Sequence, residues 1–497
     1  MRHRPANPDF AAPGPVPASA AGLDGMPNSD TPVAGSIRGR VSRVLSAPWI
    51  DRARTNHLYA VDPWDGFFGR KFTLPWAYVW CFFVSWPVSI VEFAGVPLMI
   101  AVLVRIHRNV RLIPSILLQP LLLAVAIFGI IQFTSLLWSQ DRSEGIDQAG
   151  SIRWLWSLFM LWSVIEYRRS LIIVLAAGFL IGNASQASQF LHVQLDWPTP
   201  TWDRAPDRCS GWWPPVVGGS VLTAALGLHL PAVFLPGRIR TRILAAAASF
   251  VTLAGIFATG TRGAWIASAA LIPMIAFACI VVRGRAAPAD HPASRTSSAR
   301  ARWVLAASGV VVVAAGMLWI WTGDAVSRRV ALARQDLAAA FTSRDFSSDT
   351  GARLGMALVA IDLFREHPWL GVGAGSYRPA AEALVRQRAE DTPPWRIHDH
   401  AHNGLLHIAA TTGVLGLASA LLVVILAMRN AVHLGLARWR SHGAYEWGPA
   451  GALVGLLAVS MFDPVHINAQ TSAMLAVLLS LCPSFIPESS ADRQAIP

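Results

Sequence analysis

The sequence predicts an all-α, polytopic membrane protein with about twelve transmembrane helices and one large extracytoplasmic loop. Of the 497 residues, 54% are hydrophobic and only 14% are charged, which is too apolar a balance for an ordinary soluble enzyme. Apolar runs of about 17 to 25 residues, each able to cross roughly 30 Å of hydrocarbon as a helix, recur from residue 74 to residue 482. Arginines gather in alternate connections between these runs.

Each apolar run is assigned as one crossing. The first two form a tight pair of short helices that turns near Glu92. The predicted spans are 74–90, 91–104, 112–138, 151–166, 170–193, 216–236, 242–258, 262–282, 303–322, 403–428, 444–463 and 468–482.

The arginine distribution predicts the orientation of these spans. Arginine-rich connections face the cytoplasm, and here they are residues 105–111, 168–169, 238–242, 283–302 and 429–440. The arm before Leu74 is also basic, so an even number of crossings must precede Arg105. We therefore expect both termini to be cytoplasmic.

These spans divide the chain into five parts. They are a disordered basic cytoplasmic arm at 1–73, transmembrane helices 1–9 at 74–322, an extracytoplasmic and partly helical loop at 323–402, transmembrane helices 10–12 at 403–482, and a cytoplasmic tail at 483–497.

The net charge of +12 is explained by the cytoplasmic connections, where it orients helices against anionic lipid, so no nucleic-acid partner is expected. Four cysteines show no metal-binding spacing, which argues against a disulfide or zinc framework.

The outer connection at 194–215 is rich in tryptophan, with Trp202, Trp212 and Trp213 among charged residues. Such indoles either anchor helix ends at the membrane interface or form a platform on which the apolar faces of sugars stack. Both interpretations remain open.

The loop at 323–402 contains one clear helical pattern, from Arg353 to Phe364, which Pro368 and the following glycines end. Further helix is expected at 380–390. The glycine-rich segment 371–375 lacks the Lys-Ser/Thr ending of a nucleotide loop, so we interpret it as a tight structural turn.

Two arginines at the outer face are candidates for anion binding. Arg262 follows Thr259-Gly260-Thr261 between two spans, and an arginine at such depth generally faces a cavity or a partner, although it can also snorkel to headgroups. Arg353 opens the loop helix, where it either binds phosphate or pairs with Asp349 or Asp362.

Histidines alternate just before the tenth span, at His398, His400 and His402. Alternate side chains of an extended chain point to opposite sides, so no metal site is expected. His402, followed by Asn403 at the mouth of the span, is a candidate for proton transfer. The alternative is a helix-capping or interfacial histidine.

Three motifs in this order resemble the O-antigen ligase and polymerase superfamily. They are His402-Asn403 followed after nine residues by Gly413-Val414-Leu415-Gly416, the segment Thr-Gly-Thr-Arg-Gly at 259–263, and His-Pro-Trp-Leu-Gly-Val-Gly at 367–373. Thr261 stands where serine is usual in that family, and Arg353 is matched by position more than by motif.

The resemblance implies transfer of a saccharide from an undecaprenyl-diphosphate-linked donor to a hydroxyl of a glycolipid or glycan acceptor, at the outer face of a bacterial inner membrane. Arg262 and Arg353 would then hold the diphosphate, His402 would act as the base, and Asn403 would orient the ring or the acceptor. No cofactor or metal is implied.

Ligase and polymerase activities both fit this resemblance. A polysaccharide flippase is the alternative from another class, but such transporters typically show internal repeats and charges distributed through the bundle. This sequence shows no repeat, and its unusual polar residues gather at one face.

Overall fold

The computed structural model describes residues 69–105, 119–195, 208–285, 327–388 apart from 329, and 395–484. The chain divides into two compact units, residues 1–51 and 52–497, and every described residue lies in the second. The predicted span at 303–322 and most of the two predicted terminal segments therefore lie outside the described residues.

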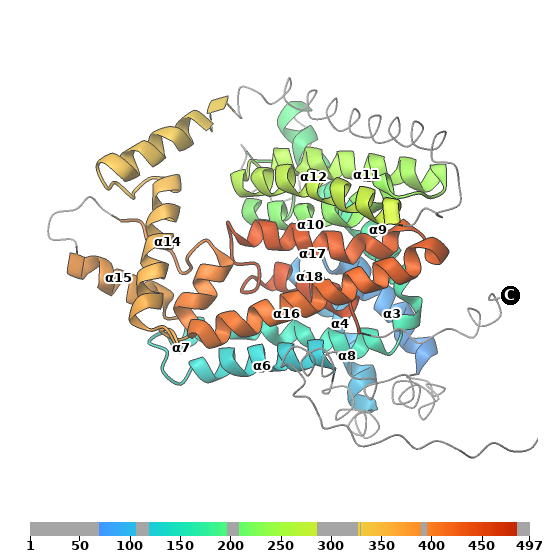
Figure 1. The fold of residues 1–497 in the computed structure, drawn as a ribbon, viewed down its shortest axis with the longest axis horizontal. Helices are drawn as coiled ribbons and strands as arrows, with labels where there is room; N and C mark the ends of the chain where they lie inside the picture. Colours follow the sequence, from blue (N-terminus) through green and yellow to red (C-terminus); the bar gives the residue numbers. More distant parts are fainter. Residues whose placement is uncertain are drawn as a thin grey trace, which may run out of the picture. The chain divides into compact units, whose positions relative to one another are not determined.

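Every regular element in the described ranges is helical, and no strand occurs there (Figure 1). The helices are α3 (Arg70–Phe83), α4 (Val88–Val104), α6 (Pro120–Ser135), α7 (Arg142–Gly150), η2 (Ser151–Trp156), α8 (Ser157–Trp162), η3 (Ile165–Tyr167), α9 (Arg168–Leu195), α10 (Pro215–Phe234), α11 (Ile239–Ala258), α12 (Arg262–Arg285), α14 (Asp349–Glu366), α15 (Tyr377–Arg388), α16 (Gly404–His442), η4 (Ala444–Trp447), α17 (Gly448–Ser460) and α18 (Ala469–Ser480).

Five of the described helices are long and apolar enough to cross a membrane, so a multi-pass helical protein is confirmed. Twelve crossings are not confirmed. The predicted span at 444–463 forms η4 and α17, which follow one another without a gap from Ala444 to Ser460. The predicted span at 468–482 forms α18 with 12 residues, fewer than the roughly 17 that a full crossing needs. The predicted span at 151–166 is broken into η2, α8 and η3.

The first predicted pair of helices is present, but its turn comes earlier than Glu92. The break falls between Phe83 and Val88, because Pro87 has no N–H to continue α3 and its ψ of 143° is extended. At the other end of the chain, α16 runs for 39 residues to His442, well beyond the predicted limit at 428.

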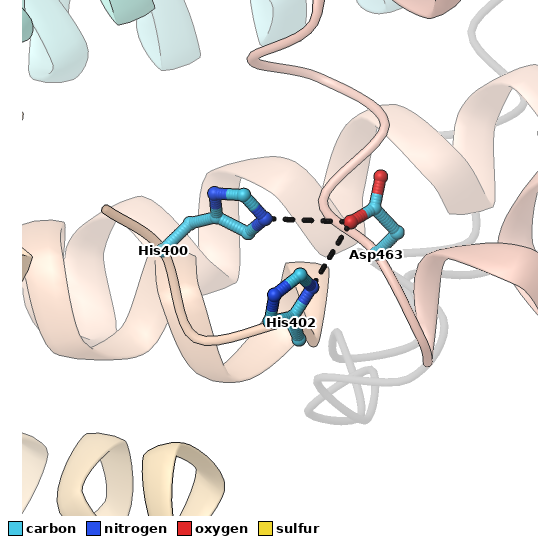
Figure 2. Close-up of side chains that lie close together, drawn as sticks. All are labelled: His400, His402 and Asp463. Atoms are coloured by element: carbon cyan, nitrogen blue, oxygen red, sulfur yellow. Dashed lines mark hydrogen bonds and ion pairs between the residues drawn. The ribbon is translucent and has the colours of Figure 1, made fainter. Parts of the chain in front are cut away.

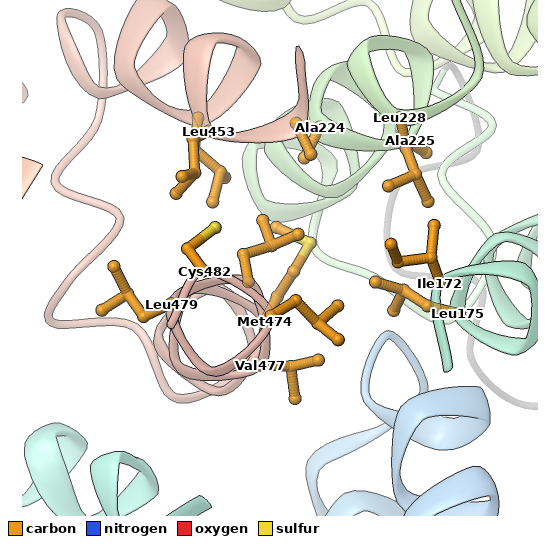
Figure 3. Packing of buried hydrophobic residues seen from close by; sticks show 14 of the residues in the cluster. Ile172, Leu175, Ala224, Ala225, Leu228, Leu453, Met474, Val477, Leu479 and Cys482 are labelled. Atoms are coloured by element: carbon orange, nitrogen blue, oxygen red, sulfur yellow. The ribbon is translucent and has the colours of Figure 1, made fainter. Parts of the chain in front are cut away.

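The core of the bundle surrounds α10, which is buried on all sides and packs against α11, α12 and α17. Gly227 and Gly451 let α10 and α17 approach closely, because a Cβ on either one would lie 2.1 Å from the carbonyl oxygen of the other. Figure 3 shows part of this core, in which residues of α9, α10, α17 and α18 meet, among them Ile172, Ala224, Leu453 and Met474.

A buried ion pair joins the ends of four helical elements. Arg168, at the start of α9, pairs with Glu446 in η4, and neither side chain is exposed. The Arg168 Nε donates to the Leu481 carbonyl oxygen at 2.7 Å, and the Arg438 Nε of α16 lies 3.5 Å from Glu446. These contacts fix the ends of α9, α16 and α18 around η4.

Candidate active site

Two histidines that precede α16 face one carboxylate (Figure 2). The Nδ1 of His402 lies 3.3 Å from Oδ1 of Asp463, and the Nε2 of His400 lies 3.4 Å from the same oxygen. Asp463 stands in the turn that follows α17. The site thus combines the start of one helix with the end of another.

The convergence of His400 and His402 corrects the prediction that alternate histidines point to opposite sides. His402 has a φ of +48°, a left-handed conformation that is uncommon for residues other than glycine. Because the chain is not extended there, the two rings lie 4.3 Å apart between centroids.

A two-histidine, one-carboxylate set is a composition that binds zinc or iron. The possible ligand atoms of His400, His402 and Asp463 lie within 4.8 Å of one another. The geometry of His400, His402 and Asp463 is therefore compatible with a metal ion, contrary to the sequence-based expectation.

Asn403 is the N-cap of α16, and both the oxygen and the nitrogen of its side-chain amide make hydrogen bonds. Its side-chain oxygen accepts a hydrogen bond from Leu406 N at 3.0 Å, and its Nδ2 donates to the Met461 carbonyl oxygen at 3.2 Å. Capping satisfies a free N–H of the first helical turn. Asn403 therefore fixes the start of α16 against the turn that carries Asp463.

Arg262, the first residue of α12, reaches the start of α14. Its Nη1 donates to Thr350 Oγ1 at 2.8 Å, and Thr350 belongs to the first turn of α14. The next residue, Gly263, has no side chain, and a Cβ there would lie 2.6 Å from Cβ of Phe462, the neighbour of Asp463. This close approach brings the Thr-Gly-Thr-Arg-Gly segment at 259–263 close to Asp463 and the two histidines that face it.

Arg353 lies one helical turn after Thr350 on α14. Within the described part of the chain, no hydrogen bond or ion pair to its guanidinium is observed. The alternative pairings with Asp349 and Asp362 are not observed either, because these carboxylates pair with Arg396 at 2.9 Å and Arg365 at 3.3 Å. Among the residues that the structure describes, Arg353 thus has Asp463 and Asp349 as charged neighbours but no carboxylate in an ion pair with it.

Burial and neighbouring charges shift the pKa of Arg353 and the pKa of His402. Burial lowers the pKa of the Arg353 guanidinium, and the charge of Arg262 lowers it further, while Asp463 opposes both. Burial also lowers the pKa of His402, and the hydrogen bond to Asp463 partly compensates. His402 is consequently neutral at pH 7 and has a lone pair to accept a proton.

The Asp463 carboxyl remains ionised in the same environment. Burial raises its pKa, but the contacts with His400 and His402 outweigh burial and hold the pKa well below the usual range. A negative oxygen therefore faces the Nδ1 of His402, which favours the tautomer with the proton on Nδ1 and the lone pair on Nε2.

The glycine-rich turn at 371–375 docks on a kink in α16. Gly413, inside that helix, has a φ of +64°, and a Cβ there would lie 2.3 Å from the backbone of Trp369. Across the contact, Val372 N donates to the Ala410 carbonyl oxygen at 2.9 Å and Val414 N to that of Pro368 at 2.7 Å. Two of the three sequence motifs thus form one contact.

The same turn confirms the predicted structural role of its glycines. Its amides are engaged within the protein, with Ala374 N donating to Ser135 Oγ at 3.1 Å and Gly375 N donating to Gln148 Oε1 at 3.3 Å. The predicted helices on either side are also present, as α14 and α15.

The tryptophans divide into three cases. Trp202 lies outside the described residues. Trp213 is only 1% exposed and its Nε1 donates to the Ser85 carbonyl oxygen at 2.7 Å, so its ring belongs to the core and offers no face to a sugar. Trp212 packs against Trp86 with its ring tilted by 38° and 4.7 Å between ring centroids, and its part in sugar binding stays a prediction.

Sequence reasoning missed Asp463 and Arg208. The Nε of Arg208 donates to the Thr259 carbonyl oxygen at 2.8 Å and its Nη2 to Thr261 Oγ1 at 3.0 Å, which braces the turn before Arg262. Asp463 had a signal, because an ionisable residue at the end of an apolar segment is a functional candidate by default. Arg208 had none, since its partner turn is 51 residues away.

Together, the apolar helices and the Arg262, Arg353, His402 and Asp463 cluster at their ends define a multi-pass helical membrane protein with a charged candidate site. Residues 247–421 match the family described as O-antigen ligase, which confirms the resemblance indicated by the motifs. The matched segment contains Arg262, Arg353, His402 and Asn403, and it indicates a ligase-like or polymerase-like activity on lipid-linked glycans. No characterised protein with curated annotation matches the chain.

Proposed function

We propose that this protein is a membrane glycosyltransferase of the O-antigen ligase type. It moves a saccharide from a polyprenyl-diphosphate donor to an acceptor hydroxyl at the outer face of the inner membrane. The observation that carries the proposal is the unpaired Arg353 beside Arg262 and the His402–Asp463 pair. Two cations and a neutral histidine are what a diphosphate leaving group and a hydroxyl nucleophile require.

The arginines supply the electrostatic part of the mechanism. Guanidinium groups bind phosphate oxygens in pairs of hydrogen bonds. As the bond between the anomeric carbon and the diphosphate breaks, negative charge grows on the leaving oxygen, and Arg262 and Arg353 stabilise it. The donor arrives activated, so the reaction needs no nucleotide.

His402 supplies the proton-transfer part. Its Nε2 takes the proton of the acceptor hydroxyl while that oxygen attacks the anomeric carbon. Asp463, at 3.3 Å from Nδ1, holds the ring in the correct tautomer and stabilises the imidazolium that forms. A single displacement of this kind inverts the anomeric configuration. The proton then passes from His402 to solvent.

A polymerase of the same family is the second candidate, because the family match covers this activity equally well. The two differ only in whose hydroxyl lies near His402. The flippase alternative is less well supported, since the two arginines, the histidines and Asp463 gather at the ends of α12, α14, α16 and α17 and not along a pathway through the bundle.

Product identification tests the proposal. Purified protein in nanodiscs is incubated with a lipid-linked oligosaccharide and separate candidate acceptors, and products are identified by mass spectrometry. We expect one acceptor to gain the saccharide with wild-type protein and none with His402→Ala, while the exposed His433→Ala on the same helix acts as the matched control. Full transfer by His402→Ala contradicts the mechanism.

A further inference from the structure

His400, His402 and Asp463 present three possible metal-ligand atoms in one small space (Figure 2). The Oδ1 atom of Asp463 lies 3.3 Å from Nδ1 of His402 and 3.4 Å from Nε2 of His400. Ligand atoms on a tetrahedral zinc ion lie about 3.3–3.5 Å apart, because each bond to the ion is about 2.0–2.2 Å long. Two of the three separations therefore match zinc coordination, and the third is within 4.8 Å.

Hydrogen bonding alone leaves these side chains incompletely satisfied. A charge-assisted hydrogen bond from nitrogen to a carboxylate is about 2.7–2.9 Å long, so both contacts to Asp463 are longer than usual. The Nε2 of His400 is buried and has no hydrogen-bond partner of good geometry among the described residues. A buried polar atom without a partner costs free energy, and an ion between the three side chains would supply a partner.

The backbone holds the three side chains in place. His402 has a φ of +48°, and its ring lies on the same side of the chain as that of His400. Asn403 caps α16 and donates to the carbonyl oxygen of Met461, so the turn that carries Asp463 is tied to the histidine segment. Ligands that are positioned in advance lose little conformational entropy on binding.

The chemistry of the three ligand atoms selects a transition metal over magnesium or calcium. Imidazole nitrogen suits zinc, copper, iron and nickel, whereas magnesium and calcium take oxygen ligands. Zinc also accepts three protein ligands with water in the fourth position. The side chains of His400, His402 and Asp463 are 27%, 13% and 17% exposed, so an ion can reach them from solvent and water can complete the coordination.

We propose that His400, His402 and Asp463 bind one Zn²⁺ ion and that the bound ion inhibits transfer. The inhibition rests on the proposed function, in which Nε2 of His402 takes the proton of the acceptor hydroxyl. Zinc on Nδ1 uses the lone pair of that nitrogen, so the proton of the neutral ring is on Nε2. The ring keeps its proton, but no lone pair then faces the acceptor.

Arg353 opposes the ion through its positive charge, which already acts on the ring of His402. The carboxylate of Asp463 offsets part of this repulsion. Arg353→Gln removes the neighbouring cation and keeps all three ligands, so it should bind zinc more tightly than wild type. A histidine elsewhere on the surface would not respond to this substitution, and weaker binding by Arg353→Gln would overturn the assignment of the ion to this cluster.

Calorimetric titration of the full-length protein with Zn²⁺ tests the binding. The protein is purified without a histidine tag, washed with EDTA and placed in nanodiscs. We expect one ion per chain in wild type, and at least about 10²-fold weaker binding in His400→Ala, since even changes behind the ligands weaken metal sites by about 10- to 100-fold. His398→Ala removes the neighbouring histidine of the same segment and should bind like wild type. No saturable binding in wild type, or equal losses in both variants, overturns the proposal.

Thermal unfolding shows which variants are folded and measures binding independently. A ligand that binds only the folded state raises the unfolding temperature, so zinc should stabilise wild type and leave His400→Ala unchanged. Asp463→Asn is a second variant that loses a ligand charge and keeps the size of the side chain. Stabilisation of both variants to the wild-type extent would contradict the assigned ligands.

Transfer rates with and without zinc test the inhibition, with each protein compared with itself. Saturating Zn²⁺ should lower the wild-type rate by at least about 10²-fold, the smallest usual effect of losing a general base. EDTA should restore this rate, and Mg²⁺ should have no effect. His400→Ala should keep its own zinc-free rate at the same zinc concentration. Unchanged wild-type transfer at saturating zinc overturns the inhibition.

The calorimetry requires no turnover, so this inference and the proposed function fail separately. Zinc binding that depends on His400, in a protein without transfer activity, would support the metal site and remove the proposed function. Transfer by a wild-type protein that binds no zinc would support the proposed function and overturn the metal site.

Discussion

The imidazole of His402 lies against the carboxylate of Asp463, with 3.3 Å between Nδ1 and Oδ1, although 61 residues separate them in the chain. The pair forms because Asn403 caps α16 and at the same time donates to Met461, two residues before Asp463. In the proposed mechanism this contact sets the tautomer of the base.

Asp463→Asn is expected to lower kcat by about 10²-fold, within the range of general-base effects, and to change KM for the donor little. The amide keeps the size of the side chain but loses the negative charge that stabilises the imidazolium. Asp399→Asn is the control, since that exposed carboxylate pairs with Arg378 and lies outside the cluster. Equal kcat loss in both variants would contradict a specific role for Asp463.

The pH dependence of kcat should follow the protonation of His402. Burial lowers the pKa of this ring below 6.5, so activity is full at pH 7 and is lost as the pH falls through a midpoint below 6.5. Because the hydrogen bond to Asp463 raises that pKa, the midpoint should move to lower pH in Asp463→Asn. Rate measurements between pH 4 and pH 8 check both points. A midpoint above 6.5 in wild type is the contrary result.

Arg353→Gln and Arg262→Gln should each lower the rate of transfer by about 10²- to 10³-fold, the usual effect of removing one charge-stabilising donor. Arg353→Lys should recover only part of the activity, because an ammonium group lacks the paired donors of a guanidinium. Arg365→Gln, at the far end of α14, serves as the control. Donor turnover at saturating acceptor is the measurement, and unchanged turnover in Arg353→Gln would remove the diphosphate role.

Gly413→Ala should destabilise the protein by about 1–3 kcal/mol, since its φ of +64° and ψ of −162° are essentially restricted to glycine. The added Cβ would also meet the backbone of Trp369 at 2.3 Å, which would displace the 367–375 turn. Thermal unfolding in detergent measures the effect. Gly237→Ala, where a Cβ meets nothing within 4 Å, is expected to unfold at the wild-type temperature.

Glu446→Gln should destabilise the bundle by about 3–5 kcal/mol, because it leaves the buried Arg168 charge without its carboxylate. The double variant Arg168→Met/Glu446→Met removes both charges, and we expect it to be more stable than Glu446→Gln alone. Unfolding midpoints of the three proteins provide the comparison. An equal loss in the single and double variants would show that packing, not charge, makes this region stable.

The elements that could be predicted from the sequence are those whose structure depends on a local pattern of residues. Helix α14, the turn at Gly371 and the start of α16 lie close to their predicted positions because periodicity, proline and glycine act within a few residues. The contacts between distant segments were not predictable. Asp463 and Arg208 join the site only through packing, and the alternation rule failed at His402 because one left-handed residue reverses the direction of the chain.

The number of crossings stays a prediction. Hydropathy detects apolar length, but it does not show at which residue a helix ends, and α17 ends at Ser460, three residues before the predicted limit at 463. Asp463 lies in the turn that follows α17, outside the helix in which it was predicted.

The left-handed conformation of His402 implies a conflict between folding and activity. An L-residue other than glycine in this region costs about 1–2 kcal/mol. Glycine at position 402 would relieve that cost and would remove the proposed base, so under the proposed mechanism a more stable version of this chain is expected to be an inactive one. Selection for thermal stability alone would then tend to eliminate the imidazole, and a search for stabilised variants of this protein should hold residue 402 fixed.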